Sequence, residues 1–186
     1  IDKITANGNY THVVTDALIK MDTSEGPMQI PRGSVLWFLQ HKQSELALHG
    51  NYWDTAAVKP SAELVIQLTA DWLNAPYLWG GRTILGVDCS GFAQTIFRLM
   101  GIQLPRDAWQ QAQFGQTVRK LKESVCGDLA FFNDREEIVH VGILLGGGRI
   151  IHSSGKVRID QIDKKGIINT DTGKYSHYLR VIKRCW

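Results

Sequence analysis

The run "DCSGF" places a cysteine, Cys89, where a helix is expected to begin. Asp88 is a favourable N-cap, so the Cys89 thiol would face the positive end of the helix dipole. We expect this position to lower the pKa of the thiol and to favour the nucleophilic thiolate. Taken alone, however, a single cysteine is more often a small buried hydrophobic residue of the core.

Two histidines supply the partners that a nucleophilic thiol needs. His140 lies in "IVHVGILL" and His152 in "RIIHSS", on either side of three consecutive glycines. A three-residue turn at these glycines would pair Leu145 with Arg149 and Gly142 with His152. His140 and His152 would then be diagonal neighbours on one face of a hairpin, where one imidazole can orient the other. A single histidine in an apolar strand would usually be a core residue, but two on one face, in a chain with a capped cysteine, favour catalysis. A one-residue slip in the register of the hairpin would put the two histidines on opposite faces.

A zinc site is the other use for a cysteine and two histidines. The chain has no HxxxH or CxxC spacing, and no carboxylate or second cysteine lies at ligand spacing. We therefore expect neither a metal nor an organic cofactor.

The first part of the chain, residues 1–58, predicts short strands. The runs "THVV", "SVLWFL" and "ELAL" are apolar or β-branched and are separated by turn-forming residues. From Ser61 the apolar residues take helical spacing, and Ser61 can cap a helix that Asn74 and Pro76 end. The period therefore changes from strand to helix near residue 60.

The remainder of the chain predicts two more helices and then a sheet. One helix should run from Cys89 to a stop at Gly101, and a short one should follow Asp107. Beyond Gly127 the runs "DLAFF", "IVHVGILL", "RIIHSS" and "YLRVIKR" predict strands. Helices followed by an antiparallel sheet indicate the α+β class.

The composition of the 186 residues is that of an ordinary globular protein, with 44% hydrophobic and 21% charged residues. The net charge of +3 suits an anionic partner such as the cell wall, but no basic run indicates nucleic-acid binding. No apolar stretch approaches the length of a membrane span.

Of the three cysteines at least one must be a free thiol, and a bridge between Cys126 and Cys185 stays open. Because the chain starts at Ile1, we expect a removed leader or a fragment.

The motifs "PYLWGG", "VDCSGF", "LPRDAWQQ", "GDLAFF", "HVGILLG" and "IIHSSG", in this order, resemble the NlpC/P60 family of papain-like cysteine peptidases. The resemblance covers residues 61–186 and implies hydrolysis of bacterial cell-wall peptides. By this resemblance Cys89 matches the nucleophile, His140 the base and His152 the third, orienting member. Tyr77 matches the tyrosine that the family places near the oxyanion site.

A finer resemblance concerns the subgroup that hydrolyses short murein peptides with a free N-terminal L-alanine. Asp107 in "LPRDAWQQ" matches a carboxylate that binds the ammonium group of the substrate, although it is also explained as a helix cap. Asp88 and Ser90 match positions that contact the bound dipeptide, and Trp79 would wall the pocket. For Asp88 a plain N-cap role is an equal alternative.

The segment before residue 61 resembles a bacterial SH3-like module, through "IPRGSVLWFL" and "NYWDTAAVKP". The predicted domains are therefore this β module at 1–60, truncated at its start, and a catalytic domain at 61–186. Trp37 and Trp53 are expected in the core of the β module rather than on a ligand platform.

The resemblance thus predicts a cysteine endopeptidase for the γ-D-glutamyl–L-diamino acid bond of murein peptides. The alternative within this class cuts stem peptides of intact peptidoglycan. A rival of another class is a catalytically inactive cell-wall-binding module, and a depressed pKa of Cys89 would favour the enzyme over it. We expect a monomer with a murein peptide as partner, no nucleic acid, and a location in the cell envelope rather than the cytoplasm.

Overall fold

The computed structural model describes residues 11–41, 46–134 and 137–186. The chain divides into two compact units, Ile1–Val58 and Lys59–Trp186. The residues predicted to carry the chemistry all belong to the second unit.

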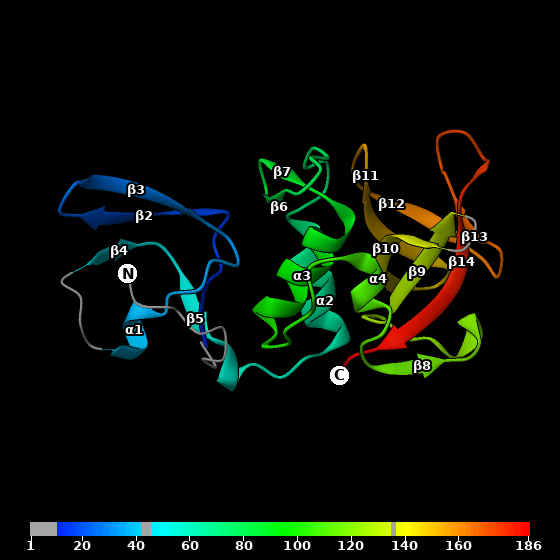
Figure 1. Cartoon of the computed structure of the whole chain (residues 1–186), viewed down its shortest axis with the longest axis horizontal. Helices are drawn as coiled ribbons and strands as arrows, with labels where there is room; N and C mark the ends of the chain where they lie inside the picture. The colour runs from blue at the N-terminus through cyan, green and yellow to red at the C-terminus, as the bar shows by residue number, and fades with distance from the viewer. Residues whose placement is uncertain (1–10, 42–45, 135–136) are drawn as a thin grey trace. The chain divides into compact units, whose positions relative to one another are not determined.

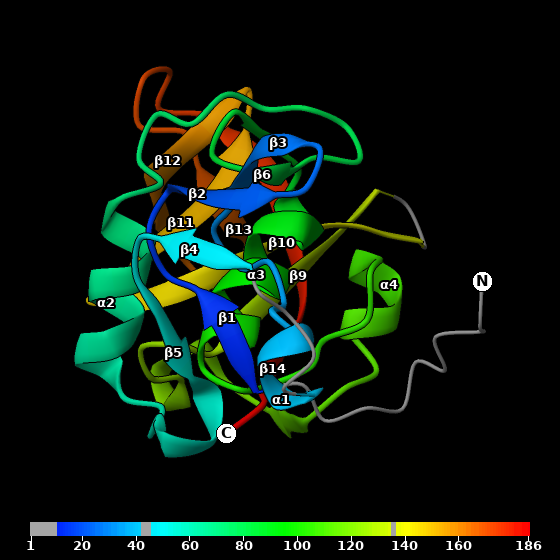
Figure 2. The same ribbon diagram turned by 90° about the vertical axis from the view of Figure 1, so that its left-hand side faces the viewer.

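The first unit consists of short antiparallel strands. Strand β2 pairs with β3 on one side and β4 on the other, and β1 pairs with β5 (Figure 2). The bounds are β1 His12–Val14, β2 Leu18–Thr23, β3 Gly26–Pro31, α1 Phe38–His41, β4 Ala47–His49, β5 Tyr52–Asp54 and the 3₁₀ turn η1 Thr55–Ala57. The core of this unit gathers the apolar side chains Val14, Ile19, Met21, Ile30, Leu36 and Phe38. Its likeness to an SH3 module stays a prediction.

The run "SVLWFL" does not form the predicted strand. Only Val35 makes a single bridge, to Val13, and the helical segment α1 begins at Phe38. The chain turns here so that Leu36 and Phe38 both enter the core, which leaves Trp37 48% exposed. The expectation that Trp37 is a core residue is therefore wrong.

The second unit begins with the helices that the apolar spacing predicts. Helix α2, Ala62–Ala70, is capped by Ser61, whose Oγ accepts a hydrogen bond from the N–H of Leu64. Helix α3 spans Cys89–Leu99, and α4 spans Ala108–Gln111 after Asp107. Among the described residues, no helix is both long enough and apolar enough to cross a bilayer.

The strands of the second unit form one antiparallel sheet that closes on itself. The order is β13-β12-β11-β10-β9-β14-β8, and β13 also pairs with β14, so a ring of strands results (Figure 1). The bounds are β8 Gln116–Val118, β9 Leu129–Asp134, β10 Glu137–Gly146, β11 Arg149–Ser154, β12 Lys156–Ile162, β13 Gly166–Ile168 and β14 Tyr175–Arg184, with the 3₁₀ turn η2 at Leu121–Glu123. A separate small hairpin, β6 Arg82–Thr83 and β7 Gly86–Val87, precedes α3.

Apolar side chains fill this barrel, and α3 packs against β10 and β11 on its outside (Figure 1). The interior set is Ala130, Phe132, Leu144, Ile150, Ile162, Ile167 and Ile182. Both faces of β9 and of much of β10 are buried, which explains why these strands stand out in the sequence as continuous apolar runs.

The β10–β11 hairpin has the predicted register at the site but a different turn. Gly142 lies opposite His152 as expected, whereas Arg149 pairs with Gly146 instead of Leu145. The turn is two residues long, Gly147-Gly148, with φ of 59° and 69° at the two glycines. Such a turn follows the twist of the strands. The extra residue is absorbed in a bulge between Leu144 and Gly146, which restores the register at the histidines.

We predict that Gly142→Ala destabilises the second unit. A Cβ at this position would lie 2.7 Å from Cδ1 of Ile150 and 3.0 Å from Cβ of His152. The free energy of unfolding, measured by urea denaturation, should fall by about 1–3 kcal/mol because the site is already filled. The double variant Gly142→Ala/Ile150→Val, which lacks Cδ1, should recover part of that loss. An unchanged stability of the single variant would contradict this packing.

Candidate active site

Cys89 is the first residue of α3, and its surroundings explain the sequence "DCSG". Asp88 adopts the extended conformation of an N-cap, and its Oδ1 accepts a hydrogen bond of 2.6 Å from the N–H of Gly91. A Cβ at residue 91 would lie 2.3 Å from the carbonyl oxygen of Gly81. Glycine is therefore required where the preceding loop crosses the first turn of α3. The Cys89 side chain is 8% exposed.

The structure brings the two predicted histidines into contact. Nε2 of His140 on β10 lies 2.8 Å from Nδ1 of His152 on β11, and both side chains are buried. The backbone N–H of Val141, the residue after His140, lies close enough to the Cys89 sulfur to lower the pKa of the thiol. The N-terminus of α3 is thus held against the strand that carries the first histidine.

Sequence reasoning missed the next group in this chain of contacts. Nε2 of His152 lies 3.0 Å from Oδ2 of Asp160, which is 1% exposed. Arg158 donates to both oxygens of the same carboxylate, at 2.8 and 2.9 Å. Two charged residues two positions apart on one strand, in "KVRIDQI", were the available signal, because such side chains share a face.

A third histidine, His177 on β14, was also not predicted. Its ring stacks on that of His140, with centroids 4.0 Å apart and 21° between the planes. The rings of His152 and His177 are nearly perpendicular, at 83°. His177 comes from "KYSHYLR", where a lone histidine near an exposed tyrosine gives no sequence signal.

The three histidines each have one nitrogen within 4.8 Å of the others, which raises the question of a metal site. The nitrogens of His140 and His152 point at one another across a hydrogen bond, and the rings of His140 and His177 lie face to face. A metal ion accepts imidazole lone pairs in the plane of each ring, so stacked rings would have to turn to bind one. The observed arrangement serves hydrogen bonding better than coordination.

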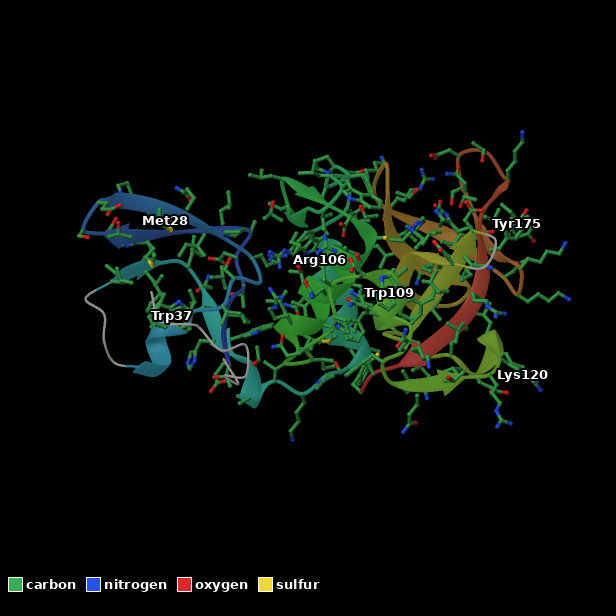
Figure 3. The ribbon with its side chains drawn as sticks, in the orientation of Figure 1. Met28, Trp37, Arg106, Trp109, Lys120 and Tyr175 are labelled. Atoms are coloured by element: carbon green, nitrogen blue, oxygen red, sulfur yellow. The ribbon has the colours of Figure 1, made fainter. Side chains whose placement is uncertain are left out.

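A cavity of about 610 Å³ opens beside Cys89. Its lining includes all the residues for which the sequence predicts substrate or oxyanion contacts, namely Tyr77, Trp79, Asp88, Ser90 and Asp107. Arg106 and Trp109, from the loop before α4 and from α4 itself, also line it (Figure 3). A neighbouring cavity of about 770 Å³ shares Trp109 and Ile138 but contains none of the predicted residues. The smaller cavity is therefore the candidate site.

Arg106 organises the side of this cavity next to Cys89. Its guanidinium donates to both oxygens of Asp88, at 3.1 and 2.5 Å, and to Oγ of Ser90 at 2.8 Å. Gly80 donates to Asp88 as well. Burial alone would raise the pKa of Asp88, but the bonds from Arg106 and from the Gly91 and Gly80 N–H groups hold it below its usual value. Asp88 is therefore a carboxylate whose oxygens already have partners.

A model of the NlpC/P60 family matches residues 74–175, which is more than half of the chain and includes the cavity and the histidine pair. The chain belongs to the NlpC/P60 family. A crystal structure of an NlpC/P60 family protein from Bacillus cereus covers 94% of this chain with a TM-score of 0.70. The match spans 62% of that protein at 24% identity and supports the NlpC/P60 fold.

Curated relatives of this NlpC/P60 chain are named as cell-wall peptidases. A γ-D-glutamyl-L-lysine dipeptidyl-peptidase of Bacillus subtilis is 40% identical over 69% of this chain, and one of Bacillus cereus is 32% identical over 73%. A murein DD-endopeptidase/LD-carboxypeptidase of Escherichia coli is 40% identical over 46% of the chain. The matched regions span 42%, 40% and 45% of these relatives, respectively.

The protonation of this NlpC/P60 site differs from the sequence expectation. Burial raises the pKa of the Cys89 thiol, and the Asp88 carboxylate adds to that effect, against lowering by the Val141, Ser90 and Cys89 N–H groups. The expected net lowering of this pKa is therefore wrong, because burial, with a further contribution from the anionic cap, outweighs the N–H groups of the helix N-terminus. Burial, followed by repulsion from His152 and His177 in their protonated forms, holds the pKa of His140 well below its usual value. Both shifts favour the neutral forms, so the depressed thiol pKa that would have favoured an enzyme over a binding module is not found.

We therefore predict that the rate of alkylation of Cys89 by iodoacetamide still rises with pH beyond pH 9, the ordinary pKa of a cysteine, instead of levelling off there. The sign follows from burial, since the rate follows the thiolate fraction and reaches its plateau only above the raised pKa. Peptide mapping by mass spectrometry separates Cys89 from Cys126 and Cys185, and the urea-unfolded protein serves as control. Alkylation that is already maximal at pH 7 would show a thiolate and contradict the prediction.

Proposed function

We propose that this protein is a cysteine peptidase that cleaves the γ-D-glutamyl–L-diamino acid bond of murein peptides with a free N-terminal L-alanine. The observation that carries the proposal is the cavity beside Cys89, at a helix N-terminus, together with the hydrogen-bonded pair His140 and His152 on the strands against which that helix packs. The names of the Bacillus relatives support the bond and the substrate class.

In this proposal Cys89 and His140 act as a neutral pair. Nε2 of His140 faces His152, which leaves Nδ1 to take the thiol proton as the sulfur attacks the γ-carbonyl carbon. The resulting imidazolium then protonates the leaving amine of the diamino acid. Next, His140 takes a proton from water, which hydrolyses the thioester and releases the dipeptide and the free thiol. The positive charge on His140 therefore forms during the reaction instead of before the substrate binds.

The tetrahedral intermediate needs hydrogen-bond donors for its oxyanion. Backbone N–H groups at the start of α3 point toward the Cys89 sulfur and are the first candidates. Tyr77 is the second. Burial raises the pKa of its phenol, and a thiolate at Cys89 and the Asp88 carboxylate would add to that effect, so that its O–H is retained at neutral pH as a donor.

Asp107 is the better of the two carboxylates for binding the ammonium group of L-alanine. The oxygens of Asp88 already accept bonds from Arg106, Gly80 and Gly91. Asp107 is exposed and lines the same cavity, and its backbone N–H donates to Oε1 of Gln110 in a capping box. We assign the ammonium to Asp107, while Asp88, Ser90 and Trp79 form the wall against the dipeptide.

Cleavage of stem peptides in intact peptidoglycan is the second candidate. The name of the Escherichia coli relative, a murein DD-endopeptidase, favours it. The two functions differ in whether the substrate amine is free or acylated, so Asp107 decides between them. The rival hypothesis, that the protein is a catalytically inactive wall-binding module, predicts no turnover of either substrate.

The proposed function is tested with a panel of murein peptides. We expect the protein to hydrolyse L-Ala-γ-D-Glu-L-Lys or its diaminopimelate counterpart, with the dipeptide identified by mass spectrometry. Cys89→Ala should abolish this hydrolysis, since no other group in the cavity is a comparable nucleophile. Substantial turnover by Cys89→Ala would refute the mechanism, and equal rates on free and N-acetylated peptides would favour the second candidate.

The role of Asp107 is tested by Asp107→Asn. Asparagine caps helices as well as aspartate does, so the variant removes the charge and retains the cap. We expect KM for the free-amine peptide to rise about ten- to hundredfold, the effect of losing a hydrogen bond to a charged group. Activity on the N-acetylated peptide should not fall. A KM that stays unchanged for the free-amine peptide would exclude Asp107 as the ammonium partner.

A further inference from the structure

Asp160 is the end of a chain of buried polar groups that starts at the site. It lies on β12, two residues after Arg158, which is the pairing partner of His152. Its carboxylate accepts hydrogen bonds from Nε2 of His152, from Nε and Nη2 of Arg158 and from the backbone N–H of Thr170, all at 2.8–3.0 Å. Arg158 is fixed in turn by an ion pair of 2.8 Å with Asp171. The carboxylate is thus held in one orientation.

The charge state of Asp160 decides what it can do to His152. Burial alone would raise the pKa of Asp160, but the bonds from His152, Arg158 and Thr170 hold it far below its usual value. An ionised carboxylate only accepts hydrogen bonds. Nε2 of His152 must therefore carry a hydrogen.

The hydrogen on Nε2 of His152 sets the direction of the next bond. A neutral imidazole with hydrogen on Nε2 has its lone pair on Nδ1, and this atom lies 2.8 Å from Nε2 of His140. His140 must then donate from Nε2, which leaves its own lone pair on Nδ1. That lone pair is the one that the proposed reaction needs to accept the proton of Cys89.

We propose that Asp160 is a positioning residue for the base: through His152 it determines which nitrogen of His140 carries the lone pair. The inference rests on the proposed function for its catalytic consequence, but the tautomers themselves exist without substrate. The hydrogen bonds run from His140 through His152 to Asp160, and both point toward the carboxylate; the proton transfer from Cys89 to Nδ1 of His140 belongs to the proposed function.

The other charged or titratable groups around the two rings do not replace Asp160. His177 stacks on the face of His140, and burial lowers its pKa to about 4, so it is neutral at pH 7. Arg158 on β12 bonds to Asp160 and to Asp171. Among the described contacts of the two rings, Asp160 is the carboxylate that accepts directly from an imidazole.

The variant Asp160→Asn reverses this order. Its amide oxygen should take the place of Oδ1, which accepts from Nη2 of Arg158 and from the N–H of Thr170, so that the NH₂ group takes the place of Oδ2 beside Nε2 of His152. His152 then carries its hydrogen on Nδ1 and donates to Nε2 of His140, and the remaining hydrogen of His140 moves to Nδ1. We expect kcat to fall by about two to four orders of magnitude with little change in KM, as when a triad histidine is held in the wrong tautomer.

The matched control is Asp128→Asn. Asp128 is also fully buried, and it pairs with Arg184 through two bonds of 2.8 and 2.7 Å on the same barrel. The control should lose folding stability comparable to that of Asp160→Asn but keep the wild-type kcat. Asp160→Glu, which retains the acceptor, should recover part of the activity.

The tautomers are read directly by ¹⁵N NMR of histidine-labelled protein in the Cys89→Ala background, which removes proton exchange with the thiol. We expect hydrogen on Nε2 of His152 in Cys89→Ala and on Nδ1 in Cys89→Ala/Asp160→Asn. If the double variant fails to fold, the spectrum of Cys89→Ala alone decides. Hydrogen on Nδ1 of His152 in that spectrum overturns the proposal, as does wild-type kcat in Asp160→Asn or a lowered kcat with unchanged tautomers. Expected tautomers in a protein without peptidase activity would refute the proposed function alone.

Discussion

The pairing of Gly142 with His152 is the constraint on which the site depends. It puts His140 diagonally across from His152, so that the two imidazoles meet at 2.8 Å. Glycine is required opposite His152 because a Cβ there would press on Ile150 and on His152 itself. Closure of the barrel through β13 and β14 fixes the hairpin on both sides. A slip by one residue would turn the two rings to opposite faces.

The electrostatics of the site follow from the burial of Cys89 and His140. Cys89 and His140 both lie out of water, and each is held in its neutral form. Asp88 stabilises the start of α3 and orders Arg106 and Ser90, yet its charge works against a resting thiolate. The same carboxylate therefore helps to build the cavity and adds to the effect of burial, which keeps the proposed nucleophile uncharged.

The residues that local patterns control could be predicted from the sequence. The cap before Cys89 and the strands around the glycine turn depend on neighbours a few residues away. The length of the turn was predicted wrongly, but the register at the histidines was predicted correctly because a bulge compensates for the difference. Asp160 was within reach of the same reasoning, because β12 follows β11 in a tight hairpin, whereas His177 depends on pairings of the distant strand β14 that no local pattern encodes. The strand predicted around Trp37 failed for the related reason that packing overrode a short β-prone run.

The closed barrel also limits how a substrate can be recognised. Strand β10 has β9 and β11 as neighbours, and β11 has β10 and β12, so the strands that carry the histidines offer no free edge. A peptide cannot be read there by strand addition, the common route by which extended peptides gain main-chain hydrogen bonds. A γ-linked D-glutamyl residue would break the two-residue repeat that such pairing needs. Because the edges of β10 and β11 are closed and the backbone of the proposed substrate is irregular, that substrate would be held by its ends.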